Sequence, residues 1–200
     1  NGQLVAENGR SLLPAAPVAV VNNFHAQPVR ADDFQLPAPN APQPVLRVIE
    51  CFDGQLITAR VDIPARVEDG LVVPDVAGDV LKLAVVNRYQ PRMAPAVAFI
   101  RGFGLKHGAL ASSVGHDSHN ITAVGCDDES ICRAVNLVIE AKGGLSAVSS
   151  EQLASLPAAN CFLPLPVLPE YLCLNEKFCK FLIGFLVFFK SLWLSLHDFQ

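Results

Sequence analysis

The amino-acid sequence predicts an α+β fold with a mainly antiparallel sheet and at least one packed amphipathic helix. Short runs rich in apolar and β-branched residues alternate with turn signals over residues 45–124, which is typical of strands. After Asp127 the apolar residues recur at helical spacing instead. Because short turns separate most of the strands, antiparallel pairing is favoured over a doubly wound parallel sheet.

The first residues predict a β-hairpin followed by a long connection. Two part-apolar runs, Gln3–Ala6 and Arg10–Leu13, flank the pair Asn8-Gly9, which tolerates positive φ in a tight turn. Seven prolines follow between Pro14 and Pro44, and they fix φ and remove backbone donors too often for regular structure. Since this stretch also carries valine and phenylalanine side chains, we expect an extended connection that lies against a surface.

The sheet is predicted from apolar runs bounded by turn signals. These signals are Asp53-Gly54, Asp69-Gly70 and Pro91. The expected strands are Val45–Ile49, Gln55–Val61, Val80–Val86, Ala96–Ile100, Asn120–Val124, Leu145–Val148 and Gln152–Leu156.

One helix is predicted over Asp127 to Lys142. Asp127 can accept a hydrogen bond from the first free amides, and Gly143-Gly144 supplies the stop. The residues expected on its buried face are Ile131, Ala134, Val135, Val138 and Ile139.

Composition limits the class of protein. The chain has 200 residues, 51% of them hydrophobic and 17% charged, with a net charge of -4, so it is long and apolar enough to fold. It lacks the basic surplus that phosphate backbones require, so we expect no nucleic-acid partner. Six cysteines without a CxxC pair or a tight framework favour a reducing compartment, the cytoplasm.

The last forty residues differ in kind from the rest. Nine of the fifteen aromatic residues lie between Phe162 and Phe199, and Phe181–Phe189 is an uninterrupted apolar run. A run of nine is far shorter than the roughly 20 residues that cross a bilayer, and its extension encloses Lys190. We therefore expect a buried or aggregation-prone helix here and no membrane attachment.

The densest polar cluster is His116-Asp117-Ser118-His119-Asn120, set in an apolar context. Three interpretations stay open. Two imidazoles and a carboxylate can ligate a metal if the loop bends. Asp117, Ser118 and His119 are the residue types of a nucleophilic triad, although a triad needs partners from separated positions. The third is a capped turn whose side chains bond local amides.

Just upstream, three glycines lie within the seven residues Gly102 to Gly108. Their order matches neither GxxxxGK[ST] nor GxGxxG, so a nucleotide loop is disfavoured. We expect a tight turn in which Gly102, Gly104 and Lys106 help to position the polar cluster and deliver it to a surface.

Residues 100–150, which begin IRGFGLKHG and contain GHDSHN, are very similar to the carboxy-terminal domain of adenine deaminases of the amidohydrolase superfamily. The resemblance extends upstream through Gln55-Leu56-Ile57-Thr58 and Ala31-Asp32-Asp33-Phe34 to the opening residues. It divides the chain into residues 1–30, a remnant of the small β-domain that follows the barrel, residues 31–157, the carboxy-terminal domain, and residues 158–200, a divergent apolar tail.

The resemblance implies an enzyme that converts adenine and water to hypoxanthine and ammonia. In the family an amidohydrolase barrel holds a binuclear manganese or iron centre whose hydroxide attacks the purine. This chain has no HxH pair, so we expect no metal ligand and no catalytic residue in it, and no activity in isolation. The expected partners are the barrel domain, adenine and, for the full enzyme, further copies of itself. The alternative is a non-catalytic binding or assembly module derived from the domain.

The resemblance also suggests a role for the polar cluster. His116, Asp117, Ser118, His119 and Asn120 are expected to pack toward the barrel mouth and to help shape the adenine pocket.

The chain departs from the family at three places. Gly115 stands where the family usually has alanine, and Arg88-Tyr89-Gln90 stands where it usually has an ERH-type sequence. After Pro157 the aromatic-rich tail resembles translation outside the normal reading frame. Since the chain also begins at Asn1, we expect a fragment of a longer protein.

Overall fold

The computed structural model describes residues 2–13, 22–52, 55, 57–115 and 118–149, and the backbone of the strand at 153–157. At the amino terminus, strands β1 (Ala6–Glu7) and β2 (Arg10–Ser11) pair antiparallel. Asn8 and Gly9 join them with φ values of 51° and 76°. The predicted hairpin is therefore confirmed.

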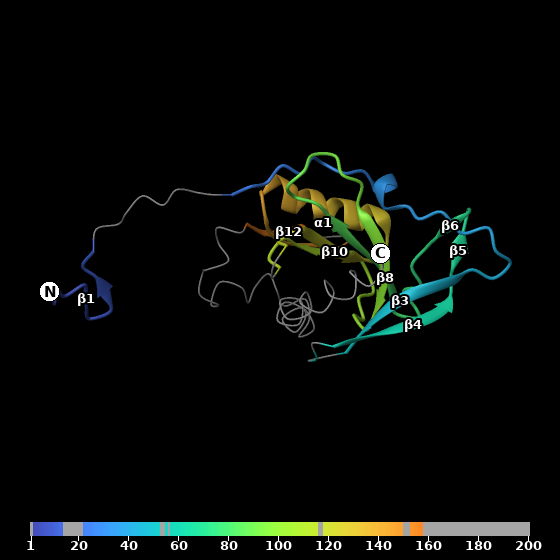
Figure 1. The fold of residues 1–200 in the computed structure, drawn as a ribbon, viewed down its shortest axis with the longest axis horizontal. Helices are drawn as coiled ribbons and strands as arrows, with labels where there is room; N and C mark the ends of the chain where they lie inside the picture. Colours follow the sequence, from blue (N-terminus) through green and yellow to red (C-terminus); the bar gives the residue numbers. More distant parts are fainter. Residues whose placement is uncertain are drawn as a thin grey trace.

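The main sheet of the described chain has eight strands in the order β12-β11-β9-β10-β7-β8-β3-β4, with one helix against it (Figure 1). Its strands are β3 (Val45–Cys51), β4 (Thr58–Pro64), β7 (Val80–Val86), β8 (Ala96–Arg101), β9 (Ala109–Ser112), β10 (Ile121–Gly125), β11 (Gly144–Val148) and β12 (Leu153–Pro157). A separate two-stranded ribbon, β5 (Val67–Glu68) and β6 (Leu71–Val72), forms around the predicted Asp69-Gly70 turn. The α+β prediction is confirmed.

Neighbouring strands of this described sheet run antiparallel except for β3 and β8, which run parallel. Their register places Val48 opposite Phe99. Both side chains are buried in one cluster with Val72 and Val80. This parallel pair joins strands that are far apart in the sequence, so the short turns of the chain gave no sign of it.

Strand β9 was not predicted, because its residues Ala-Leu-Ala-Ser have little β-propensity. The structure explains this composition. The helix crosses so closely that a Cβ on Gly125 would lie 2.5 Å from Cγ1 of Ile131 and 2.8 Å from the Ala109 Cβ. A residue larger than glycine at position 125 would therefore not fit between α1 and β9.

Helix α1 (Asp128–Glu140) confirms the helix prediction and its ends. The Asp127 carboxylate accepts a hydrogen bond from the Ser130 amide at 2.7 Å, and the Gly143 amide donates to the Val138 carbonyl at 2.8 Å. The five predicted apolar residues are all buried against the sheet.

The connection before β3 lies on the same side of the sheet as α1 over its described part (Figure 1). The His25 and Ala26 amides donate to the Arg88 carbonyl, and the Asn136 amide group on the helix bonds both backbone groups of Val29. A short 3-10 helix, η1 (Ala31–Phe34), then buries Phe34 completely. The expectation of an extended connection against a surface is confirmed for residues 22–30, whereas residues 31–34 form a 3-10 helix.

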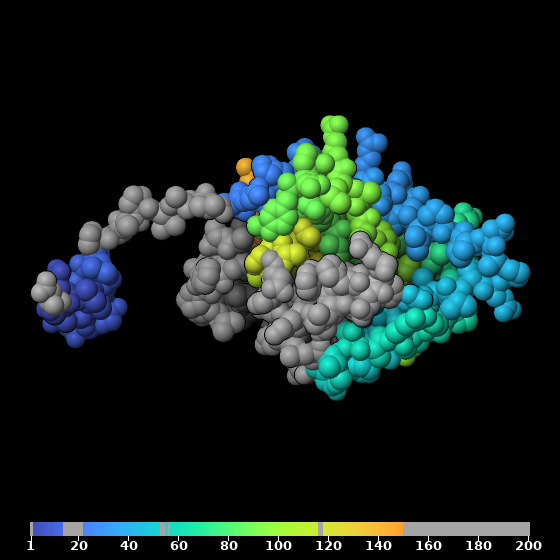
Figure 2. All heavy atoms as spheres, in the orientation of Figure 1, coloured from blue at the N-terminus to red at the C-terminus, as the bar shows by residue number. Residues whose placement is uncertain are grey.

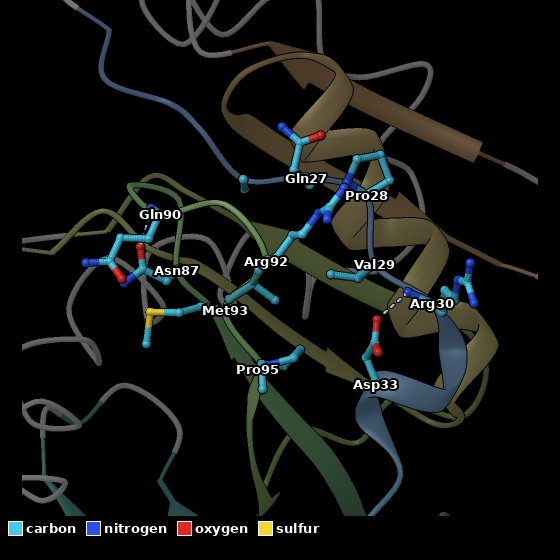
Figure 3. Close-up of a pocket in the computed structure, with 13 residues that line it drawn as sticks. Gln27, Pro28, Val29, Arg30, Asp33, Asn87, Gln90, Arg92, Met93 and Pro95 are labelled. Atoms are coloured by element: carbon cyan, nitrogen blue, oxygen red, sulfur yellow. Dashed lines mark hydrogen bonds between the residues drawn. The ribbon is translucent and has the colours of Figure 1, made fainter.

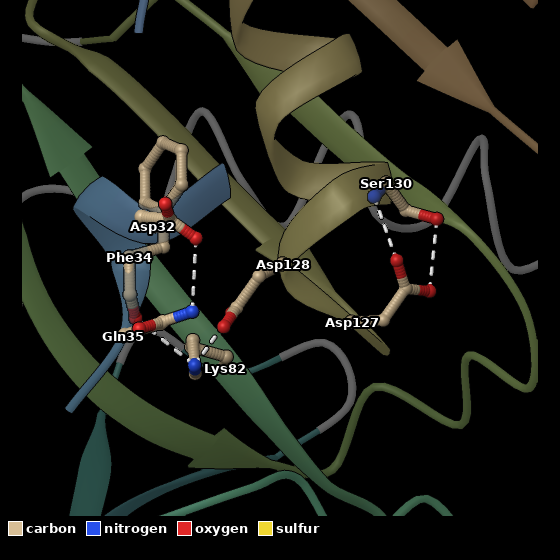
Figure 4. Close-up of polar contacts among 7 residues, drawn as sticks. All are labelled: Asp32, Phe34, Gln35, Lys82, Asp127, Asp128 and Ser130. Carbon is tan, nitrogen blue, oxygen red and sulfur yellow. Dashed lines mark hydrogen bonds and ion pairs between the residues drawn. The ribbon is translucent and has the colours of Figure 1, made fainter. Parts of the chain in front are cut away.

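A buried lysine joins three of these elements (Figure 4). Lys82, in the middle of β7, is 1% exposed, and its Nζ donates to the Phe34 carbonyl at 3.0 Å and to the Asp128 carboxylate. Burial raises the pKa of Asp128, while the bond from Lys82 acts in the opposite direction. The amine thus connects the central strand, η1 and the amino end of α1.

No helix within the described ranges is long and apolar enough to cross a membrane. The apolar run at 181–189, on which the membrane question depends, lies outside the described residues.

We predict that Val138→Asp lowers the free energy of unfolding by roughly 3 to 5 kcal/mol, because it buries an unpaired charge. Val138 is 1% exposed and faces the sheet. Thermal and urea denaturation measure the loss, and Arg133→Ala on the exposed side of α1 is the control, expected within about 0.5 kcal/mol of the parent. An unchanged melting temperature for the aspartate variant would contradict the packing.

We predict that Lys82→Met costs about 2 to 3 kcal/mol, because it leaves the Asp128 carboxylate and the Phe34 carbonyl without their donor. The double variant Lys82→Met, Asp128→Asn should recover part of this loss, since it removes the unpaired charge. Urea denaturation of the two variants and the parent gives the comparison. A double variant less stable than the single one would contradict this account of the cluster.

Candidate functional site

The polar segment and the loop after β7 meet at one end of the sheet. Strands β7 and β10 pair with Val86 opposite Ile121, so the residues after Val86 lie next to those before Ile121. In Figure 2 the yellow atoms of the chain before β10 lie beside the green atoms of the β7–β8 connection. These two loops, with the connection at Phe24 to Ala26, form the candidate site.

Hydrogen bonds tie the two loops together. The Tyr89 hydroxyl donates to the Ser118 carbonyl at 2.7 Å, and the Arg88 amide donates to Oδ1 of Asn120 at 3.3 Å. Within the segment, the Asn120 amide donates to the Ser118 hydroxyl at 3.4 Å. The Ser118 and Asn120 side chains are thus partly buried, and their positions depend on the loop after β7.

The loop after β7 is itself fixed by an Asx turn. Oδ1 of Asn87 accepts from the Tyr89 amide at 2.8 Å and from the Gln90 amide at 3.1 Å. The turn sets the direction in which Arg88 and Tyr89 leave the sheet. These residues entered the sequence analysis only as a departure from the family pattern, and the Asn-Arg-Tyr-Gln order after a strand is the signal that could have drawn attention to them.

The structure places three of the five polar-cluster residues, and His116 and Asp117 lie outside the described residues. His119 is exposed and has a φ of 52°, in the left-handed region. Within the described ranges, no three His, Cys, Asp or Glu side chains are grouped so that they could hold a metal. In keeping with the capped-turn interpretation, the Ser118 hydroxyl accepts from the local Asn120 amide, whereas the Asn120 oxygen accepts from the Arg88 amide of the neighbouring loop.

Arg88 has an unusual environment in this site. Its Cζ lies over the Phe24 ring at 5.6 Å from the ring centre and over the Tyr89 ring at 5.1 Å. Its Nε is buried and has no hydrogen-bond partner.

The glycine loop lies at the other end of the sheet. Strand β9 pairs antiparallel with β10 from Ala109 opposite Gly125 to Ser112 opposite Thr122, so residues 102–108 and residues 118–120 lie at opposite ends of β9. The Asp79 carboxylate fixes the loop, accepting from the Gly102 amide at 3.0 Å and from the Gly104 amide at 2.7 Å. Lys106 is exposed there. The glycine loop and the described part of the polar cluster are therefore not neighbours in the structure.

A surface hollow of about 590 Å³ lies beside the site, between the connection and the β7–β8 loop (Figure 3). Asn87 and Gln90 line one side, and Gln27, Pro28 and Arg30 line the other. The Arg92 side chain points toward Gln27 and Pro28 in Figure 3. Ser118, His119 and Asn120 do not line this hollow.

Two of the described cysteines, Cys51 and Cys126, are not activated as nucleophiles. Desolvation, with a smaller contribution from Asp79, raises the pKa of Cys51 to about 12. Desolvation, followed by the charge of Asp127, raises the pKa of Cys126 to about 11. Both thiols stay protonated near neutral pH, and the thiolate is the reactive form.

A family model described as "Adenine deaminase C-terminal domain" matches residues 55–168. The adenine deaminase of Salinibacter ruber is 50% identical over 159 residues, which are 79% of this chain and 29% of that protein. This chain belongs to the adenine deaminase C-terminal domain family. The adenine deaminase of Borreliella afzelii is 36% identical over 193 residues, 92% of this chain and 34% of that protein, and that of Parabacteroides distasonis is 40% identical over 156 residues.

These matches show how much of the relatives the chain covers and how far along the chain the similarity continues. The chain spans about a third of the length of the curated relatives it matches. The match to the adenine deaminase C-terminal domain continues past Pro157 to residue 168, and the Borreliella afzelii alignment covers too much of the chain to end at Pro157. The aligned region therefore enters the segment that the sequence analysis set apart as a divergent tail.

We predict that Tyr89→Phe loosens the site. It removes the hydroxyl that bonds the Ser118 carbonyl, which should cost about 1 kcal/mol of unfolding free energy and speed amide exchange in residues 118–120. Hydrogen exchange followed by NMR measures the change. Gln90→Ala, an exposed change in the same loop, is the control, and equal exchange rates in both variants would contradict the role of the hydroxyl.

Proposed function

We propose that this chain is the non-barrel, carboxy-terminal part of an adenine deaminase and that it acts only together with a catalytic barrel. The observation that carries the proposal is the 50% identity to the Salinibacter ruber adenine deaminase over 79% of this chain and 29% of that protein. Hydrolysis of adenine to hypoxanthine and ammonia is then the reaction of the longer protein.

The candidate site is proposed to face the mouth of that barrel. Support comes from the two loops at one end of the sheet, which are tied together by Tyr89 and Asn120 and present an exposed His119. A purine has ring-nitrogen acceptors and an exocyclic amine, which hydroxyl, amide and imidazole groups can bond. Groups fixed by neighbouring loops discriminate between ligands, because a ligand that does not match leaves them unpaired.

The manganese or iron ions implied by the family do not fit the described residues, which contain no grouped set of three ligands. We therefore assign metal binding to the barrel and derive no chemical step on this chain. The cytoplasm is the proposed compartment, in keeping with Cys51, Cys126 and Cys132 as free thiols, and homo-oligomerisation is proposed for the longer enzyme.

The test uses two proteins. The first is the 200-residue chain alone, assayed for ammonia release from adenine with added manganese or iron, and we predict no turnover above a metal-only control. The second is a chimera in which this chain replaces the matching 159 residues of the Salinibacter ruber enzyme, and we predict deamination by it. The Salinibacter ruber enzyme with that region deleted is the control.

The outcomes distinguish the proposal from its alternative. Turnover by the isolated chain would show that the chemistry does not belong to the barrel alone. A folded chimera without activity would favour the alternative, a binding or assembly module that no longer supports catalysis. Activity equal to that of the deleted control would lead to the same conclusion.

A further inference from the structure

We propose that Arg88 is a docking residue that binds a carboxylate of the part of the longer protein that this chain lacks. This inference rests on the proposed function, because it names the chemistry of the partner that covers the candidate site. It starts from the Arg88 guanidinium, which two aromatic rings hold in place but whose Nε has no hydrogen-bond acceptor.

The first observation is that the Arg88 guanidinium is held in place by two rings. Its Cζ lies 5.6 Å from the Phe24 ring centre and 5.1 Å from the Tyr89 ring centre. Both rings are themselves fixed, because Phe24 packs against the main core and the Tyr89 hydroxyl bonds the Ser118 carbonyl. The side chain has therefore lost much of its conformational freedom before any partner binds.

The second observation is that this held cation lacks acceptors. Nε is buried without a hydrogen-bond partner, and a guanidinium has five N–H donors and stays charged at physiological pH. None of the ion pairs among the described residues includes Arg88. Aromatic rings attract the cation but offer no acceptor in the plane of its N–H groups. A buried donor left in this state is costly, and Arg88 as a whole is only partly buried, so a ligand can reach the guanidinium.

The geometry of the donors selects the ligand. Adjacent N–H groups of a guanidinium match the two oxygens of a carboxylate in a planar, bidentate pair. Arginine and tyrosine are also the residues most enriched at the energetic centres of protein interfaces. Such a centre is formed here by Arg88 with the rings of Tyr89 and Phe24. It lies beside Ser118 and Asn120, at the end of the sheet proposed to face the barrel. Since the chain spans about a third of its relatives, most of such a protein remains to supply the carboxylate.

The first experiment tests the ligand chemistry on the 200-residue chain itself. Sodium acetate is titrated at constant ionic strength against sodium chloride, and the Nε–Hε resonance of Arg88 is followed by NMR. We expect a downfield shift that saturates with acetate concentration. The exposed Arg133 on α1, observed in the same spectrum, is the matched control and should show only a small linear drift.

Other probes separate the alternatives. Adenine, hypoxanthine and inorganic phosphate are titrated in the same way. A saturating shift with a purine but not with acetate would overturn the proposal and make Arg88 a substrate contact. A larger shift with phosphate than with acetate would overturn it in favour of a general anion site. No shift with any probe would also overturn it.

The second experiment identifies the partner in the chimera with the Salinibacter ruber enzyme. Arg88→p-benzoylphenylalanine is irradiated, and mass spectrometry locates the crosslink, with the same substitution at Arg133 as the control. We expect a crosslink from position 88 to a peptide of the Salinibacter ruber part that contains Asp or Glu. Crosslinks only within this chain would overturn the docking role. Deamination by the unsubstituted chimera is scored separately, so failure of this inference and failure of the proposed function are distinguishable.

Discussion

The buried amine of Lys82 is the constraint on which the arrangement of this domain depends. An unpaired ammonium inside a protein is very costly, so this side chain is compatible with the core only when η1 and the start of α1 both supply acceptors. One side chain thereby fixes the position of the proline-rich connection and of the helix relative to β7. Beyond Lys82, Ala84 and Val86 continue the same buried side of the strand beneath α1. The strand ends at Val86, and the candidate site begins directly after it.

The geometry of the candidate site is set by the connection before β3 and by strands β7 and β10. The connection held by Lys82 at Phe34 is the same segment that places Phe24 beside Arg88 and whose His25 and Ala26 amides bond the Arg88 carbonyl. From the other side, the register of β7 with β10 places Asn120 next to the loop. Loops that carry function are commonly positioned by a rigid framework in this way. The site is consequently made by three segments distant in sequence, and none of them forms it alone.

The sequence predicts those features that depend on interactions between residues close together in the chain. The ends of α1 were predictable because Asp127 and Gly143 act within a few residues of themselves, and β7 was predictable from an apolar run that only Lys82 interrupts. Strand β9 was missed because its alanines have little β-propensity and pack in the core shared with α1, which joins segments distant in the sequence. The parallel β3–β8 pair was missed because it joins distant strands. In the site, the polar cluster stood out as a run of five residues, whereas the importance of Arg88 arises from Phe24, which is distant in the sequence.

The two ends of the sheet differ in how completely the polar groups of the described residues are hydrogen-bonded, and this difference supports the proposal about which end faces a partner. At the glycine-loop end, Asp79 accepts from two loop amides, and Gly108 packs so tightly against the Val148 carbonyl that a side chain would not fit. That end is closed by the chain's own contacts. At the other end, Arg88 is ordered by rings yet keeps a buried donor unbonded, and His119 is presented outward on left-handed backbone. A stable domain tolerates such groups where a further surface completes them, which supports the proposal that this end of the sheet faces a catalytic barrel.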